Sequence, residues 1–208
     1  MPASLAVART DPGDAGRHEV VATLLAAFRD DPAVRSLYPT DLDYVRYFPG
    51  FLLAFGGRAF EEGTVDEDAD GHAAALWFPP GIEPDGEAVM NHLAASIAAK
   101  RLGPFVAGME VQASLHPSEP HWYLPWMGVV PEAQGMGIGT ALLRQGLARA
   151  DADRLPVYLE ATSRRSAAFY ARHGFEAKAT VSVPNYPAIV TNVAYGPIGA
   201  FRVRNVCG

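Results

Sequence analysis

The chain has very little cysteine and no long hydrophobic run. Its one cysteine, Cys207, stands next to the C-terminus, which excludes an intrachain disulfide framework and a cysteine-rich metal site. No stretch approaches the roughly 18 consecutive apolar residues that a membrane span needs, and residues 1–5 lack the basic-then-apolar pattern of a signal peptide. These absences predict a cytoplasmic protein that does not enter a membrane.

Positive charge is also scarce. The chain holds 17 Lys and Arg against 23 Asp and Glu, a formal net charge of -6 at pH 7. This balance provides no global basic field that would attract nucleic acid or anionic lipid, so we expect neither as a partner. Any anionic ligand must therefore be held by local groups.

What the chain does have is enough apolar sequence for a core. Its 208 residues are 49% hydrophobic and 19% charged, which predicts one globular domain over residues 1–208 and excludes a mainly disordered protein. The 20 Gly and 17 Pro are dispersed, and they divide the chain into many short elements.

Hydrophobic periodicity predicts the element order β-α-α-β-β-α-α-β-α-β-α-β-β. The predicted helices cover residues 14–31, 44–60, 87–102, 105–115, 138–150 and 164–173, and the predicted strands cover residues 5–9, 64–65, 72–78, 121–129, 156–161, 176–183 and 188–195. This order indicates an α/β fold with a mixed central sheet flanked by helices.

Several local expectations follow from turn and helix-breaking residues. Asp31-Pro32 should stop the first helix, and breaks are expected at Pro49-Gly50, at Gly56-Gly57 and at Gly103-Pro104. Pro125 cannot donate a ladder hydrogen bond, so we expect a bulge or a local splay there. The acidic run 66–71 reads as a solvated hairpin turn.

A glycine cluster separates the predicted strand 121–129 from the helix 138–150. Three glycines at alternate positions in 135–139 remove every second Cβ where helical amides are unpaired, so ligand oxygens can approach the backbone. These amides and the helix dipole, about half a positive charge, suit a pyrophosphate. Arg144 and Arg149 follow on the same helix, where we expect solvated surface positions.

Two phosphate-binding patterns fit this loop poorly. A P-loop needs a lysine before its Ser or Thr, and the loop has none. A dinucleotide fingerprint needs a third glycine, but that position is Thr140 when counted from Gly135 and Leu142 when counted from Gly137. Glu160 does end the next strand, where a ribose-binding acid would stand. A nucleotide-dependent oxidoreductase is therefore a minor alternative.

A third pattern fits. Residues 129–139 read Val-Val-Pro-Glu-Ala-Gln-Gly-Met-Gly-Ile-Gly, which resembles the V-x-P and Q/R-x-x-G-x-G/A acyl-CoA loop of the GNAT N-acetyltransferase superfamily. Residues 166–175 read Ser-Ala-Ala-Phe-Tyr-Ala-Arg-His-Gly-Phe and resemble the A-x-x-F-Y-x-x-x-G-F segment of the same superfamily. Segments 77–80, 119–124 and 158–162 look like its puromycin N-acetyltransferase-like branch.

The resemblance implies acetyl-CoA as co-substrate and assigns residues to it. In the family the strand before the loop splays from its neighbour and pairs with the pantetheine arm, and the loop holds the pyrophosphate. The residues in matching positions are Met127, Val129, Gln134, Gly135, Met136, Gly137, Ile138, Gly139, Thr140, Ser163 and Ser166. Ser163 stands where many members carry an asparagine, about seven residues before the tyrosine, and Ser166 lies one helical turn nearer to it.

The resemblance also implies that Tyr170 acts as general acid on the leaving thiolate. A phenol near pKa 10 is more basic than a thiolate near 8.5, so full proton transfer in water is uphill by about 2 kcal/mol. Either the site lowers the pKa of the phenol, or Tyr170 donates a hydrogen bond.

An alkylammonium acceptor must lose a proton before it attacks, which requires a general base. The first candidates are Glu160, at the end of a strand beside the expected cleft, and Glu110, in the helix 105–115. His116 and His121 are further candidates. Because Cys207 is remote, we expect direct transfer in a ternary complex.

The remaining expectations concern ligands and partners. The six histidines show no paired metal spacing, so no metal is expected. A helical insertion at about 85–118 favours a small, partly apolar amine as acceptor, with an acceptor pocket formed by this insertion and by Trp77, Phe78, Trp122, Tyr123 and Trp126. A noncatalytic acyl-CoA-binding module remains an alternative function. The resemblance also makes a homodimer an option.

Overall fold

The computed structural model describes residues 7–9, 14–182 and 189–196, and the fold below refers to them. The described helices are α1 (Asp14–Ala27), α2 (Pro32–Leu37), α3 (Asp41–Gly56), α4 (Arg58–Glu61), α5 (Gly86–Ser96), α6 (Ala99–Ser114), α7 (Ile138–Asp153) and α8 (Arg164–Ala171). The strands are β1 (Val7–Arg9), β2 (Val65–Asp68), β3 (Ala73–Phe78), β4 (Trp122–Val129), β5 (Val157–Ala161), β6 (Glu176–Ser182) and β7 (Ile189–Tyr195).

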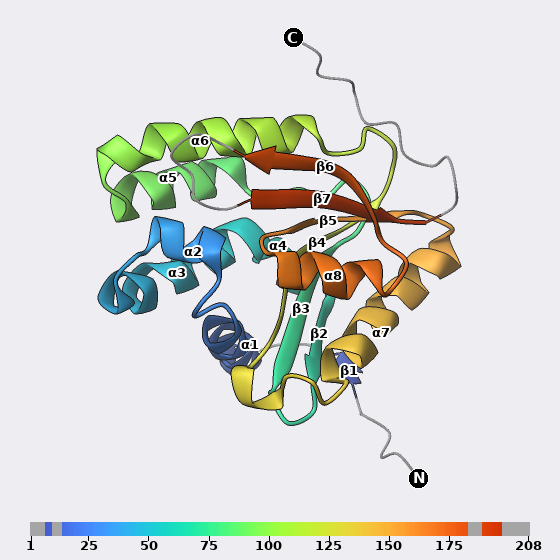
Figure 1. The fold of residues 1–208 in the computed structure, drawn as a ribbon. Helices are drawn as coiled ribbons and strands as arrows, with labels where there is room; N and C mark the ends of the chain where they lie inside the picture. Colours follow the sequence, from blue (N-terminus) through green and yellow to red (C-terminus); the bar gives the residue numbers. More distant parts are fainter. Residues whose placement is uncertain (1–6, 10–13, 183–188, 197–208) are drawn as a thin grey trace.

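The described strands form one sheet in the order β1-β2-β3-β4-β5-β7-β6. Neighbouring strands are antiparallel except β4 and β5, which are parallel. Helices α1 and α3 pack on one side of the central strands, and α7 packs on the other with α8 beside it (Figure 1). The predicted α/β fold with a mixed central sheet flanked by helices is confirmed.

Strand periodicity divides the core into two clusters, one on each face of the sheet. In β3, Leu76 and Phe78 join the cluster under α1 and α3, whereas Ala75 and Trp77 join the cluster under α7. All four side chains are fully buried. A strand that is apolar on both faces belongs in the middle of such a sheet.

Strand β4 contains a bulge. Its register with β3 pairs Trp126 with Leu76 but Tyr123 with Phe78, so β4 carries one extra residue beside Pro125. The extra residue breaks the alternation of side chains, and Tyr123 and Trp126 therefore belong to the same core cluster. The bulge predicted at Pro125 is confirmed.

Strands β4 and β5 pair only where they begin. The register joins Trp122 to Val157 and Tyr123 to Tyr158 and then stops, although both strands continue. The splay expected in this strand is thus present between β4 and β5. The gap opens toward the glycine loop that follows β4.

Helix α2 was not predicted. Asp31-Pro32 does stop α1, but it also starts a new helix, because Asp31 Oδ1 accepts hydrogen bonds from the amides of Ala33 (2.9 Å) and Val34 (3.0 Å). Pro32 occupies the first helical position, where its missing N–H is not needed.

Two predicted helix breaks were wrong. Pro49 lies inside α3 and Pro104 lies inside α6, and the α5–α6 break falls at residues 97–98. Packing of buried neighbours such as Phe48 and Phe105 outweighs the loss of one backbone hydrogen bond. Within the described ranges, no helix is both long enough and apolar enough to span a membrane.

The prediction of a solvated turn over the acidic run 66–71 is correct only for residues 69–71, which are exposed and connect β2 to β3. Asp66 and Asp68 lie in β2 and are 0% and 4% exposed. Asp66 forms a two-pronged ion pair with Arg149 of α7 at 2.7 and 2.6 Å. The expected surface position of Arg149 was therefore also wrong, because a buried carboxylate needs a charged partner.

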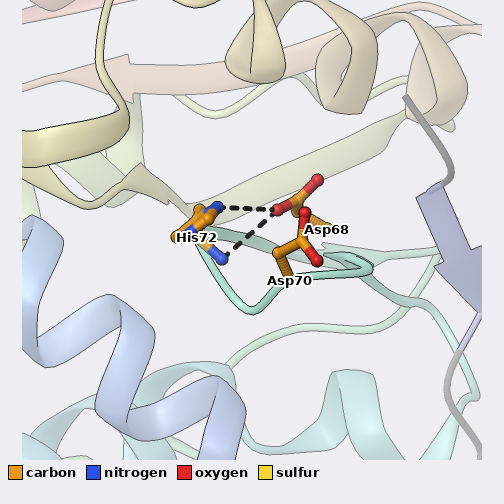
Figure 2. A group of neighbouring side chains, drawn as sticks. All are labelled: Asp68, Asp70 and His72. Carbon is orange, nitrogen blue, oxygen red and sulfur yellow. Dashed lines mark hydrogen bonds and ion pairs between the residues drawn. The ribbon is translucent and has the colours of Figure 1, made fainter. Parts of the chain in front are cut away.

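The turn between β2 and β3 gathers Asp68, Asp70 and His72, whose ligand-type atoms lie within 4.8 Å of one another (Figure 2). Asp68 Oδ2 accepts the His72 backbone amide and faces Nδ1 of its ring, both at 3.4 Å. These contacts close the hairpin turn.

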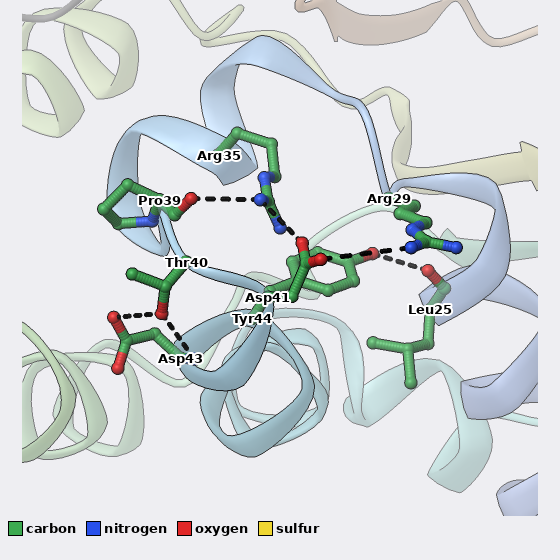
Figure 3. A network of polar contacts seen from close by, with 8 residues as sticks. All are labelled: Leu25, Arg29, Arg35, Pro39, Thr40, Asp41, Asp43 and Tyr44. Atoms are coloured by element: carbon green, nitrogen blue, oxygen red, sulfur yellow. Dashed lines mark hydrogen bonds and ion pairs between the residues drawn. The ribbon is translucent and has the colours of Figure 1, made fainter.

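The connection between α2 and α3 is fixed by polar contacts (Figure 3). Arg35 donates to the Pro39 carbonyl at 3.0 Å and to Asp41 at 2.9 Å. Tyr44 Oη donates to the Leu25 carbonyl at 2.5 Å, which ties α3 to α1. This framework positions one wall of the cavity described next.

Candidate active site

The glycine loop forms a backbone cradle at the start of α7. Gly135 and Gly137 have positive φ angles of 81° and 86°, and Gly137 is the N-cap of α7 without any side-chain cap. A left-handed backbone of this kind favours glycine. The first amides of α7 are therefore left for an anion, as the sequence indicates.

Backbone groups of Met127 and Val129 face the gap between β4 and β5. The Val130 amide donates to the His72 carbonyl of the preceding turn, so alternate residues of β4 pair with β3. Met127 and Val129 lie at the other alternate positions and point their backbone groups away from β3. These are the positions that the resemblance assigns to the pantetheine arm.

Gln134 is held by two contacts. Its Nε2 donates to the Val129 carbonyl at 3.0 Å, and its Oε1 accepts from Arg165 Nη2 at 2.7 Å. Arg165 belongs to α8, so this chain of contacts links α8 to the loop. Sequence reasoning missed Arg165, because nothing in the local pattern distinguishes it from its neighbour Arg164.

The hydroxyl groups predicted to contact the cofactor make internal contacts. Ser163 and Ser166 form a capping box at the start of α8, with their Oγ atoms 2.9 Å apart. Thr140 Oγ1 lies 3.1 Å from His173 Nε2. His173 Nδ1 donates to the Phe169 carbonyl at 2.9 Å, so in the neutral ring Nε2 accepts from Thr140.

Tyr170 is buried on the α7 face of the sheet. It lies in the cluster that contains Trp122 and Leu142, and its ring contacts Phe175 at 5.4 Å between centroids. Burial raises the pKa of Tyr170 well above its ordinary value. The phenol thus stays protonated and is suited to donate a hydrogen bond.

Glu160 lies on the opposite face, at the centre of a polar cluster. Its carboxylate accepts hydrogen bonds from Tyr123 Oη and from His116 Nε2, both at 2.8 Å. The His116 ring packs 4.4 Å from the Tyr158 ring between centroids. Burial and the Glu160 carboxylate raise the pKa values of Tyr123 and Tyr158, so both phenols remain neutral donors.

The two histidines differ in their partners. His116 Nε2 carries the proton that Glu160 accepts, which leaves Nδ1 as the free acceptor of a neutral ring. His121 Nδ1 donates to the Glu119 carbonyl at 2.8 Å. Burial lowers the pKa of His121, against the raising effect of that hydrogen bond.

These groups line one end of a cavity of about 600 Å³. The cavity is bounded by α2, α3, α5, α6 and the β4–β5 gap, and it contains Glu160, Glu110, His116 and His121 in its wall. Glu110 is exposed, unlike Glu160. The structure therefore brings both predicted carboxylates and both histidines to one cavity, and it places Tyr170 outside its lining.

The predicted acceptor pocket was correct in part. Tyr123 and Trp126 line the cavity together with residues of the predicted helical insertion. Trp77 and Trp122 lie on the other face, where each ring contacts the Arg149 guanidinium. Phe78 is fully buried in the core. The bulge in β4 decides which aromatic residues face the cavity.

Residues 86–177 match the protein family described as "Acetyltransferase (GNAT) domain". A mycothiol acetyltransferase of Streptomyces griseus is 34% identical over 187 residues, which cover 77% of this chain and 55% of that protein. One from Acidothermus cellulolyticus is 31% identical and covers 84% of this chain and 56% of that protein. The chain thus spans about half the length of these curated relatives.

A crystal structure described as histone acetyltransferase HPA2 and related acetyltransferase from Corynebacterium glutamicum has the same fold. It shares 26% identity, covers 93% of this chain and 97% of that chain, and superposes with a TM-score of 0.64. The family match, the relatives and the splayed sheet together identify the class. The chain belongs to the GNAT acetyltransferase superfamily.

Proposed function

We propose that the protein transfers acetyl from acetyl-CoA to a primary amine of a small molecule by direct attack in a ternary complex. One observation supports this most strongly. The strands on either side of the β4–β5 gap contribute Tyr123, Trp126 and Glu160 to the cavity wall, and the glycine loop directly follows β4. A donor held at the loop and an acceptor in the cavity would meet in that gap.

The donor side is built from backbone groups. The amides at the start of α7 would hold the pyrophosphate, and those of Met127 and Val129 would pair with the pantetheine arm. An N–H aimed at the thioester carbonyl is worth roughly 3 kcal/mol in the transition state. No lysine is needed for this arrangement, which fits a chain of net charge -6.

On the acceptor side we assign the base to the His116–Glu160 pair. Glu160 holds the His116 Nε2–H, so Nδ1 can take the proton of the ammonium and the carboxylate stabilises the resulting imidazolium. Glu160 has both oxygens engaged, which favours the histidine as the direct acceptor. Glu110 is exposed and, within the part of the chain that the structure describes, has no such partner.

Tyr170 would complete the reaction by donating a hydrogen bond to the departing thiolate. Its raised pKa argues against full proton transfer from the phenol. Of the two roles that the sequence leaves open, the raised pKa therefore favours hydrogen-bond donation.

The experiment that tests this function measures binding and turnover separately. Calorimetry with acetyl-CoA and NAD should show binding of acetyl-CoA, and thiol release should appear when amines are added. Binding of acetyl-CoA without thiol release on any amine would favour the noncatalytic module. Binding of NAD alone would favour the oxidoreductase.

The base assignment predicts which substitutions slow the reaction. His116→Gln should lower kcat/KM at least tenfold, because the group that takes the proton of the ammonium is lost. Glu160→Gln should also lower kcat/KM, since the histidine loses its carboxylate partner. Glu110→Gln is the control and should keep the wild-type kcat/KM. An unchanged kcat/KM in both test variants would move the assignment to His121 or to water.

A further inference from the structure

The walls of the cavity have a composition that the acetyl-transfer chemistry does not require. Away from the β4–β5 gap they are mostly apolar, and these apolar side chains include Phe51, Phe55, Phe105, Met109, Trp126 and Val89. The aromatic rings are held edge to face: Phe51 meets Trp126 at 6.0 Å and Phe105 at 6.2 Å between centroids. The result is a preformed aromatic surface.

Helical spacing shows how this surface arises. Phe51 and Phe55 are four residues apart on α3, and Phe105 and Met109 are four residues apart on α6, so each pair presents one helix face to the cavity. His116 continues the α6 face beyond the end of the helix. The same surface therefore runs from the apolar end to the catalytic pair.

The charges of the cavity have one sign. Glu83, Glu110 and Glu160 belong to its lining, and among the described residues that line it there is no Lys or Arg. An acceptor that carries a carboxylate or phosphate would meet unpaired negative charge. An ammonium group would instead be attracted toward the carboxylates.

The size and polarity of the cavity narrow the class of acceptor further. About 600 Å³ is the volume of a site for a drug-sized molecule, larger than a two- or three-carbon amine would fill. A polyhydroxylated amine would place many of its hydroxyl groups against the apolar part of the wall, where they would lack hydrogen-bond partners. An aromatic or branched alkyl body would instead bury its surface there.

We propose that the acceptor is an amphipathic primary amine without an acidic group, its aromatic or branched alkyl body among Phe51, Phe55 and Phe105 and its amino group at His116. This inference rests on the proposed acetyl transfer and names its acceptor class.

The test compares amines that differ in one property. Thiol release from acetyl-CoA is measured with 2-phenylethylamine, with ethanolamine, with phenylalanine and with putrescine. We expect kcat/KM for 2-phenylethylamine to exceed that for each of the others at least tenfold. A preference for ethanolamine, phenylalanine or putrescine would overturn the acceptor class and leave acetyl transfer intact.

A pair of variants on α6 tests the location. Val106 lines the cavity, whereas Val111 on the same helix is 44% exposed and does not. Val106→Trp should raise KM for 2-phenylethylamine at least tenfold and leave the Kd of acetyl-CoA unchanged, and Val111→Trp should change neither. Equal effects of the two substitutions would contradict the location of the acceptor in the cavity. Thermal unfolding checks that both variants fold.

Calorimetry separates the failure of this inference from the failure of the proposed function. Suppose that no amine releases thiol, but that 2-phenylethylamine binds to the wild type and not to Val106→Trp. This result would reject acetyl transfer and would still support an amine site in the apolar cavity. If thiol is released but 2-phenylethylamine does not bind, the cavity assignment fails.

Discussion

Glu160 shows what the sequence could and could not determine about a single residue. Its position at the end of a predicted strand made it a candidate, and the structure places it in the wall of the cavity. Its partner His116 lies 44 positions earlier in the chain, and no local pattern joins the two. Glu160 and Glu110 looked equivalent in sequence because burial is a property of the folded chain.

Tyr170 carries a prediction that follows from its burial. Tyr170→Phe should lower kcat tenfold or more, because the hydrogen bond to the leaving thiolate is lost, while the Kd of acetyl-CoA stays the same. Stopped-flow thiol release and calorimetry measure the two quantities. Tyr195→Phe serves as control, since that hydroxyl contacts Asp151. An unchanged kcat in Tyr170→Phe would remove the residue from the mechanism.

Asp31 carries a prediction about stability and pH. Burial raises its pKa, although hydrogen bonds from Thr162, Val34 and Ala33 favour the ionised form. The folded state therefore holds the carboxyl proton of Asp31 more tightly than the unfolded chain does, where this carboxyl titrates near pH 4. As a result, the free energy of unfolding falls as the pH rises from about 4 through the folded pKa.

Asp31→Asn should remove that contribution, because an amide can accept the same backbone amides and donate to Thr162. Relative to wild type, the free energy of unfolding of the variant should increase between about pH 4 and about pH 7. Urea unfolding across this range measures it. A difference between the two proteins that does not vary with pH would show that Asp31 does not titrate there.

At the scale of elements, periodicity identified most strands and helices, while boundaries depended on contacts far along the chain. The order of elements along the chain was largely predictable, and so was an interruption in β4, because Pro125 has no N–H to donate to a ladder. Helix α2 was missed because it is short and begins at a residue pair that also ends α1. The burial of Asp66 depended on Arg149, which is 83 positions away.

The loop before α7 gives the prediction for this scale. Gly137→Ala places a Cβ on a left-handed residue at a cost of about 1–2 kcal/mol and in the path of a ligand, so the Kd of acetyl-CoA should rise at least fivefold. Gly103→Ala is the control, because Gly103 is helical and an added Cβ meets nothing within 4 Å. Calorimetry measures the affinity of both variants for acetyl-CoA. Equal affinities would contradict a role of the glycine loop in binding acetyl-CoA.

For the whole molecule, the two functional halves lie on opposite faces of one sheet. The loop and Tyr170 belong to the α7 face, and the cavity with His116 belongs to the face under α1 and α3. Two substrates bound in this way can be present together. This arrangement could be anticipated from the family resemblance, but the lining of the cavity could not, because it comes from four helices and three strands.

Simultaneous binding predicts the form of the kinetics. Initial rates at varied acetyl-CoA and amine should give intersecting reciprocal plots, and acetylated enzyme should not accumulate. Cys207→Ala should retain full activity, since the single cysteine, which lies outside the described residues, takes no part in transfer. Parallel plots or loss of activity in this variant would indicate a covalent relay.

The bulge in β4 also determines how the strand tolerates changes in length. Beyond it, Gly128 faces α1, where an added Cβ would lie 2.5 Å from Ala27 Cβ, while Met127 faces α7. Loss of one residue at Pro125 would exchange these two directions and press the methionine side chain into a space that fits only glycine. In relatives that pack α1 against β4 in the same way, the residue types at the bulge should therefore vary. The number of residues between the positions that match Tyr123 and Gly128 should stay the same.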